Sequence, residues 1–282
     1  MAHPLNKDRK WAAFIWFVRW QVSSRLNPYP ILYPFTERSK LLISRGMRGA
    51  TGNLYCGLHD FSEMGFLLHC LRPGDVFVDV GANVGSYTIL ASAEVGARTV
   101  AIEPVPSTFG VLRANLMLNG LDHLVDARNI GLGGEKGTIK FTKRLGTVNH
   151  VATGNDTDTI DVPIETLDDV VAENTPQVIK IDVEGYEAEV LRGGRRALAN
   201  PEVKALIVEL NGSGDRYGFT DTDVHRELLA SGFSPFSYDP LTRRLAPIAT
   251  FGSQDTIYLR DVPSVVERVQ SARPIGVRTA WI

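Results

Sequence analysis

Apolar residues in this chain recur in short blocks of the length of a β-strand. Val76, Phe77, Val78 and Val80 form one block of β-branched and aromatic side chains, typical of a strand covered on both faces of a parallel sheet. Further blocks lie at 99–102, 125–130, 178–183 and 205–210. Segments with helical spacing separate most of them, and this alternation predicts an α/β fold with a doubly wound, largely parallel sheet.

The segments between these blocks carry the spacing and end residues of helices and turns. Helices are predicted from Ser86 onward and at Glu63–Leu71, Thr108–Leu118, 166–170, Glu187–Ala199 and Asp223–Ser231. Asp60 is the candidate cap of the helix at Glu63–Leu71, with Glu63 at the capping-box position. Strands outside the parallel set are predicted at 138–142, 159–163, Ser234–Tyr238 and Thr256–Arg260.

The stretch Asp75–Thr88 carries the first chemical indication. Its strand runs into a turn in which Gly81 and Gly85 bracket Asn83. Such glycines allow positive φ and close approach of a ligand, towards which the following helix would point its free N–H groups. The middle glycine of a dinucleotide-binding GxGxxG turn is missing, and Asp79 precedes the turn. An acid at this place suits an ammonium group better than a pyrophosphate.

A second acid, Glu103, ends the next predicted strand and is placed to accept hydrogen bonds from both hydroxyls of a ribose. Together the two acids and the glycine turn indicate a ligand that is both nucleoside and amino acid, and S-adenosylmethionine (SAM) fits. We therefore assign Asp79, Gly81, Asn83 and Gly85 to the methionine part. A structural tight turn in another kind of α/β protein is the alternative.

The later strand ends supply candidates for the rest of the chemistry, because ligands collect at the carboxyl ends of the strands in an open α/β sheet. Asn129 is a candidate for the adenine region, or an ordinary turn residue. Alternation puts Lys180, Asp182 and Glu184 on one side of the chain. They form either an acid/base or substrate-orienting cluster, or an ion-pair network in which Lys180 neutralises Asp182.

Other polar residues complete the predicted site. His150, in the polar loop between 138–142 and 159–163, is a plausible base for a hydroxyl, although a loop histidine is often only solvated. Glu209 and Asn211 are candidates for binding acceptor hydroxyls, with His59 and Tyr217 as weaker ones. Asp182, Glu184 and Glu209 would suit Mg²⁺. Because no fixed-spacing metal motif is present, we expect no metal.

The N-terminal region predicts an extension of the sheet domain. Trp11, Phe14, Ile15 and Val18 lie at helical spacing and predict an amphipathic helix packed on the domain, with Trp16 and Trp20 nearer its flank. A dimer contact and peripheral membrane contact through residues 11–20 are alternatives. The apolar stretch is too short to cross a membrane, and no signal-peptide cleavage site follows it. Residues 41–56 predict a small β-hairpin over the SAM end of the sheet.

Composition narrows the class of protein. The 282 residues, with 44% hydrophobic and 22% charged content, are ordinary for a globular chain. The net charge of −2 argues against a nucleic-acid partner. The two cysteines, Cys56 and Cys70, make neither a disulfide framework nor a metal site, and we expect reduced thiols in a cytoplasmic protein.

Three segments carry a resemblance to a known family: GDVFVDVGANVGSYT (74–88), AIEPVPSTFGVLRANLMLNG (101–120) and VIKIDVEGYEAEVLRGG (178–194). On these the chain resembles the FkbM family of SAM-dependent methyltransferases, over roughly residues 63–239. The resemblance implies a Rossmann-like sheet with an antiparallel edge, an active site at 180–185, and hydroxyl acceptors such as those of macrolide rings and sugars. We expect an N-terminal extension at 1–58, a methyltransferase domain at 59–262 and a C-terminal tail at 263–282.

We therefore expect a SAM-dependent O-methyltransferase acting on a small molecule or glycan. An NAD-dependent oxidoreductase is one alternative, disfavoured by the missing glycine. A SAM-binding module without catalysis is the other, disfavoured by intact acids at the strand ends. A homo-oligomer is left open.

Overall fold

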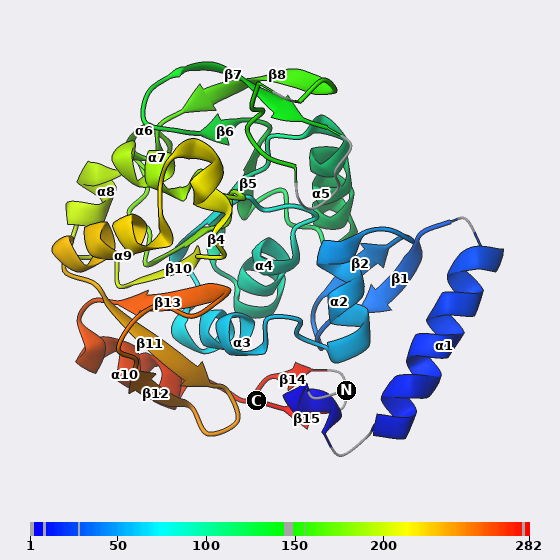
Figure 1. The fold of residues 1–282 in the computed structure, drawn as a ribbon. Helices are drawn as coiled ribbons and strands as arrows, with labels where there is room; N and C mark the ends of the chain where they lie inside the picture. Colours follow the sequence, from blue (N-terminus) through cyan, green and yellow to red (C-terminus); the bar gives the residue numbers. More distant parts are fainter. Residues whose placement is uncertain (1–2, 8–9, 28, 144–148, 155, 278–279) are drawn as a thin grey trace.

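The computed structural model describes residues 3–7, 10–27, 29–143, 149–154, 156–277 and 280–282. Within them lies an eight-stranded sheet of order β12-β11-β13-β10-β9-β3-β4-β5 (Figure 1). Its parallel strands are β3 (Val76–Val80), β4 (Arg98–Ile102), β5 (Val125–Arg128), β9 (Val178–Ile181) and β10 (Ala205–Glu209). The predicted doubly wound sheet is confirmed, because the strand order reverses beside β3.

The antiparallel edge of the sheet is also confirmed. β13 (Asp255–Leu259) pairs antiparallel with β10, and β11 (Ser234–Asp239) pairs antiparallel with β13. A further strand that the pattern did not predict, β12 (Arg244–Pro247), forms a hairpin with β11.

Helices cover both faces of the sheet, and the alternation along β3 decides which residues meet them. Phe77 packs in the core built with α3 (Phe61–Cys70), α5 (Pro106–Leu118) and α10 (Val262–Ser271). Val78 and Val80 pack on the other face, in the core that contains residues of α7, α8 and α9. The latter helices span Glu187–Arg192, Arg195–Ala199 and Asp221–Ala230. The strand is therefore buried on both sides, as its apolar run predicts.

Two helix predictions need correction. The helix expected at Glu187–Ala199 is broken into α7 and α8 at Gly193 and Gly194. The chain turns there against a neighbouring loop, since a Cβ on Gly193 would lie 2.1 Å from the Gly133 carbonyl oxygen. Asp60 stands at the N-cap of α3, but its side chain makes no capping hydrogen bond. Its Oδ2 accepts one from the Tyr87 hydroxyl at 3.1 Å instead.

A small three-stranded sheet lies above the carboxyl edge of the main sheet (Figure 1). It contains β6 (Gly131–Leu132), β7 (Gly137–Thr142) and β8 (Thr159–Glu165), and β7 and β8 are antiparallel as predicted. The capped helix α6 (Leu167–Val170) follows, with Thr166 accepting from the Asp169 amide. Part of the polar loop between β7 and β8, at 144–148 and 155, lies outside the described residues.

The N-terminal extension contains a hairpin, but not where the sequence predicts it. The hairpin is β1 (Ile31–Pro34) with β2 (Lys40–Ile43), whereas most of the predicted hairpin segment is helix α2 (Arg48–Cys56). The helix forms because Ala50 and Leu54 are fully buried against the core, which outweighs the low helix propensity of its two glycines.

The helix that precedes the hairpin, α1 (Lys10–Leu26), packs through the face opposite to the predicted one. Trp20 is buried, and Phe17 and Gln21 contact Tyr55 of α2, the rings of Phe17 and Tyr55 lying 5.3 Å apart. The predicted packing residues Trp11, Phe14, Ile15 and Val18 are exposed to solvent. Among the described helices, α1 included, none is long and apolar enough to cross a membrane.

The segment 263–282, expected as a tail, is folded onto the domain. It holds most of α10 and the strands β14 (Gly276–Val277) and β15 (Ala280–Trp281). Arg268 of α10 donates to Asp75 Oδ2 at 2.6 Å, which ties this helix to the start of β3. The C-terminal segment thereby supports the strand that leads into the glycine turn.

Candidate functional site

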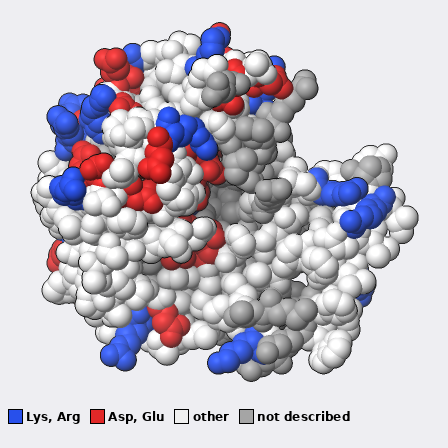
Figure 2. Space-filling model, in the orientation of Figure 1, with Lys and Arg blue, Asp and Glu red and all other residues white. Residues whose placement is uncertain are grey.

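A cavity of about 260 Å³ opens at the carboxyl ends of the parallel strands, beneath the small sheet. Residues at the ends of β3, β4, β9 and β10 line it, together with residues of α2, the loop before α3, and β7. Acidic side chains gather on one side of the hollow in the middle of the face shown in Figure 2. The strand ends therefore bring the predicted chemistry to one place, as the topology requires.

The glycine turn has the predicted backbone, and its two glycines are also required for packing. Gly81 and Gly85 have φ of 83° and 93°, and Asn83 between them has φ of 52°, which confirms the predicted positive φ. The close approach at these glycines is made by the chain itself. A Cβ on Gly81 would lie 1.8 Å from the Asp182 carbonyl oxygen, and one on Gly85 would lie 2.6 Å from Leu112 Cδ1.

Glu103 is buried at the end of β4 and ties the turn to that strand. Its Oε2 accepts from the Asn83 amide at 3.0 Å, and its Oε1 accepts from the Val105 amide at 2.9 Å. Burial raises the pKa of Glu103 to about 7, against the lowering effect of these two hydrogen bonds. The carboxylate lines the cavity, so a ligand there would meet an acceptor already held in place.

Asp79 and Lys180 are neighbours on adjacent strands and both are almost fully buried. Asp79 Oδ2 accepts from the Thr88 hydroxyl at 2.6 Å, while its Oδ1 is buried without a hydrogen-bond partner. Burial also raises the pKa of Asp79, with Lys180 acting in the opposite direction. A buried carboxylate oxygen without a donor is unfavourable, and a cationic ligand in the cavity would relieve it.

Lys180 forms the ion pair that the sequence left as an alternative. Its Nζ lies 2.6 Å from Asp182 Oδ2 and 4.8 Å from the centre of the Tyr87 ring. Burial lowers the pKa of Lys180, but the charges of Asp182, Asp255 and Asp79 outweigh it and raise the pKa overall. The lysine therefore stays charged beneath the acids.

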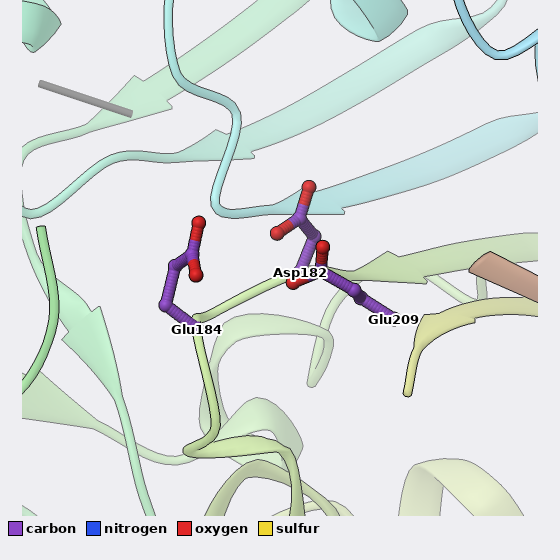
Figure 3. A group of neighbouring side chains, drawn as sticks. All are labelled: Asp182, Glu184 and Glu209. Atoms are coloured by element: carbon purple, nitrogen blue, oxygen red, sulfur yellow. The ribbon is translucent and has the colours of Figure 1, made fainter. Parts of the chain in front are cut away.

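Asp182, Glu184 and Glu209 form a cluster in which one carboxylate oxygen of each lies within 4.8 Å of the others (Figure 3). Simple strand alternation does not produce it, because β9 ends at Ile181 and Glu184 has φ of 56°. A turn after the strand brings Glu184 beside Asp182, and the neighbouring strand β10 contributes Glu209. The predicted convergence of acids is real, although its geometry comes from the turn.

The acids of this cluster differ in pKa. Burial, followed by the charge of Asp182, raises the pKa of Glu184 to about 7. Burial and the charges of Asp182 and Glu184 raise the pKa of Glu209 well above its usual range. Glu184 can therefore exchange a proton near neutral pH, whereas Glu209 holds one.

Four predicted site residues lie outside the cavity lining, Gly85 of the glycine turn among them. Asn129 donates to the carbonyl oxygens of Glu103 and Pro104, at 2.8 and 3.0 Å, and so fixes the loop after β4. His150 is buried, with Nε2 3.6 Å from Asp156 Oδ2. Asn211 is exposed and its Oδ1 accepts from the Ser213 amide. Their proposed ligand roles stay predictions. Asn149, the neighbour of His150, does line the cavity.

Sequence reasoning missed an acid on the antiparallel edge. Asp255 is the first residue of β13 and is paired in register with Glu209, the last residue of β10. An antiparallel strand begins at the edge where its parallel neighbour ends, so its first residue joins the strand ends. Burial and nearby acids raise the pKa of Asp255 despite the charge of Lys180. Other cavity residues missed from the sequence include Asp60, Gln254, Tyr186 and Phe141.

The residues present fit a cationic cofactor. Seven carboxylates and one lysine are among the described residues that line the cavity. SAM carries a sulfonium and an ammonium, which these acids would attract. Asp182, Glu184 and Glu209 could also hold a divalent ion. One Asp182 oxygen is already paired with Lys180, however, and the expectation of no metal stays a prediction.

Comparison with known proteins was made on the sequence and on the fold. The model of the FkbM methyltransferase domain matches residues 79–235. The chain is 31% identical over 152 residues to the hexuronic acid methyltransferase AglP of Haloferax volcanii, which covers 53% of this chain and 61% of AglP. It is 30% identical over 190 residues to the 31-O-demethyl-FK506 methyltransferase FkbM of Streptomyces tacrolimicus, covering 54% of this chain and 72% of that protein.

Among solved structures, the methyltransferase FkbM of Methylobacillus flagellatus superposes with a TM-score of 0.46 at 18% identity, over 74% of this chain and 52% of that one. The domain match begins at Asp79 and includes Glu103, Asp182, Glu184 and Glu209, and it covers more than half of the sequence. The chain belongs to the FkbM methyltransferase domain family.

Proposed function

We propose that this protein transfers a methyl group from SAM to a hydroxyl of a small molecule or glycan. The observation that carries the proposal is that the cavity has two halves, which lie at the ends of different strands in the order β10-β9-β3-β4. Glu103 and the glycine turn follow β4 and β3. Asp182 and Glu184 follow β9, and Glu209 ends β10. Three strand spacings separate the outer pair, about 14 Å, which leaves room for a cofactor and an acceptor side by side.

The cofactor half would be held by residues of β3 and β4. Asp79 and the turn at 81–85 would bind the amino-acid part of SAM, with the buried Oδ1 of Asp79 as an acceptor for its ammonium. Glu103, already fixed by two amides, would accept from the ribose hydroxyls. When bound, SAM supplies an electrophilic methyl group on a positively charged sulfur.

The acceptor half would supply the base. A hydroxyl must lose a proton as it attacks, and a base with a pKa near the working pH is best suited to take it. Among the three clustered acids we assign this role to Glu184, whose pKa is about 7. Asp182, held by Lys180, would orient the hydroxyl, and protonated Glu209 would donate a hydrogen bond to a second oxygen of the acceptor.

The acceptor class rests on chemistry and on the relatives. The names of two relatives specify a hexuronic acid and 31-O-demethyl-FK506 as what they methylate. Hydroxyl-rich acceptors suit a cavity lined by carboxylates, since each carboxylate can accept hydrogen bonds from several hydroxyls. The acids disfavour a nucleic acid, whose phosphates they would repel.

The first experiment is calorimetric titration of SAM into the purified protein and into Glu103→Gln. We expect micromolar binding, weakened about tenfold in the variant, or about 1.4 kcal/mol. Glu135→Gln, at an exposed turn position, is the matched control and should bind as the wild type. Absence of SAM binding by a folded sample would refute the proposal, and NADH would be titrated next.

The second experiment identifies the acceptor. Purified protein and methyl-labelled SAM are incubated with a panel of sugars, nucleotide sugars, glycans and hydroxylated small molecules, with RNA as a comparison. We expect label on a hydroxylated acceptor, absent with Glu184→Gln, and no label on RNA. We also expect full activity after dialysis against EDTA. Loss of activity that Mg²⁺ restores would instead make Asp182, Glu184 and Glu209 metal ligands.

A further inference from the structure

The outward face of α1 is an apolar stripe that is exposed to solvent. Trp11, Ile15, Val18, Val22 and Leu26 follow one another at intervals of three or four residues, and thus share one side of the helix. Their exposed fractions are 80, 55, 40, 53 and 81%. Such a row of large apolar side chains on a surface marks a site of interaction.

The position of α1 leaves this stripe open. The helix stands at the side of the molecule, beside α2 and the β1–β2 hairpin (Figure 1). Buried Trp20 and the Phe17–Tyr55 contact hold its opposite face against the domain. The stripe is therefore presented outwards by a helix whose inner side is already anchored.

Charge identifies the partner. The first 50 residues contain nine basic residues (Lys and Arg) and two acidic residues (Asp and Glu). The remaining 232 residues contain 21 basic and 30 acidic residues. The helix itself carries Lys10, Arg19 and Arg25 and no acid. On the face shown in Figure 2, basic side chains lie over α1 and the hairpin, and the hairpin loop carries one exposed acid, Glu37. A helix with basic residues and exposed aromatic and aliphatic side chains has the composition of helices that bind the surface of an anionic bilayer.

We propose that α1 docks this protein on an anionic lipid surface. The stripe from Trp11 to Leu26 would enter the boundary between headgroups and acyl chains, and Arg19 and Arg25 would meet lipid phosphates. Arg19 lies over the Trp16 ring, 6.0 Å from its centre, at the flank of the stripe. A second copy is a poorer occupant, because a symmetric contact would bring the arginines of both helices together without an acid on α1 to offset them.

The test is cosedimentation of the full chain with vesicles of phosphatidylcholine alone and of equimolar phosphatidylcholine and phosphatidylglycerol. We expect binding to the anionic vesicles only, weakened by added salt. Ile15→Glu with Val22→Glu should reduce binding about tenfold or more, because two apolar side chains that enter the lipid are replaced by charges. Leu241→Glu with Met117→Glu, at exposed positions elsewhere, should bind as the wild type.

Arginine variants and the oligomeric state complete the test. Arg19→Gln with Arg25→Gln should lose the preference for anionic vesicles, whereas Arg244→Gln, exposed on β12, should keep it. Equal binding to both kinds of vesicle, or unchanged binding by Ile15→Glu with Val22→Glu, would overturn the proposal. So would a wild-type dimer that this pair of substitutions converts to a monomer without any vesicle binding.

Discussion

The carbonyl oxygen of Asp182 occupies the place where a side chain on Gly81 would begin. A Cβ at position 81 would lie 1.8 Å from that oxygen, and the φ of Gly81 is 83°. Asp182 in turn donates its amide to the Val80 carbonyl at 3.0 Å. The turn assigned to the cofactor and the turn assigned to the acceptor are thus in direct backbone contact. A change in either one moves both halves of the site.

Gly81→Ala is therefore expected to damage the fold and the site together. The methyl group would clash with backbone, which cannot rotate away, and the positive φ adds strain, for a loss of about 3 kcal/mol or more. Gly74→Ala is the control, since Gly74 has φ of 85° and nothing within 4 Å of its Cβ position. It should lose only about 1 kcal/mol. Chemical denaturation of both variants measures the difference, and equal losses would contradict the contact.

The pH dependence of methyl transfer should report Glu184. A base with a pKa of about 7 is ionised above that pH, so the rate should rise as the pH passes through about 7 and then level off. Glu184→Gln should lower the rate and remove this rise. His150→Gln should retain it, because His150 faces Asp156 and does not line the cavity. If instead the His150 variant loses the rise, the base is the histidine.

Lys180 should set the pH at which this rise occurs. Its positive charge lowers the pKa of Glu184, against burial and the charge of Asp182. Lys180→Met keeps the length of the side chain but removes that charge, so the rise in rate should move to higher pH. Rate profiles of variant and wild type with the same acceptor measure the shift. A shift to lower pH, or none, would show that the lysine is not coupled to the base.

The strand ends were predictable from the sequence because parallel topology forces them together. Asp79, Glu103, Asp182 and Glu209 each stand at or just beyond a strand of apolar residues, and an open α/β sheet brings such positions to one edge. Asp255 was missed for a physical reason. It precedes its strand, and only the knowledge that β13 runs antiparallel to β10 places it beside Glu209.

The N-terminal extension was poorly predicted because two of its glycines, Gly49 and Gly52, lie inside a helix and not in a turn. Gly49 and Gly52 lie inside α2, where a Cβ would be 3.2 Å from Asn83 Oδ1 and 2.6 Å from the His59 ring. They permit the glycine turn and the loop before α3 to pack on the helix, which no local pattern reveals. The packed face of α1 was likewise ambiguous, since apolar residues lie on both of its sides.

The acids of the cavity should make the SAM-free protein less stable as the pH rises. Burial and neighbouring charges raise the pKa of Glu209 above the usual value near 4.5 that the unfolded chain would have. The native state then holds a proton that the unfolded state releases, so stability is lost from about pH 4.5 upwards, towards the raised pKa.

Glu209→Gln removes this titration while keeping a neutral side chain of the same shape. It should stabilise the protein by about 1–3 kcal/mol near pH 8 and have little effect near pH 4.5, where the glutamate is protonated in the native state and only about half ionised in the unfolded chain. Urea denaturation at the two pH values, with Glu135→Gln as the exposed control, measures the effect. A variant less stable than the wild type near pH 8 would show that Glu209 is ionised in the native state and held by a partner cation.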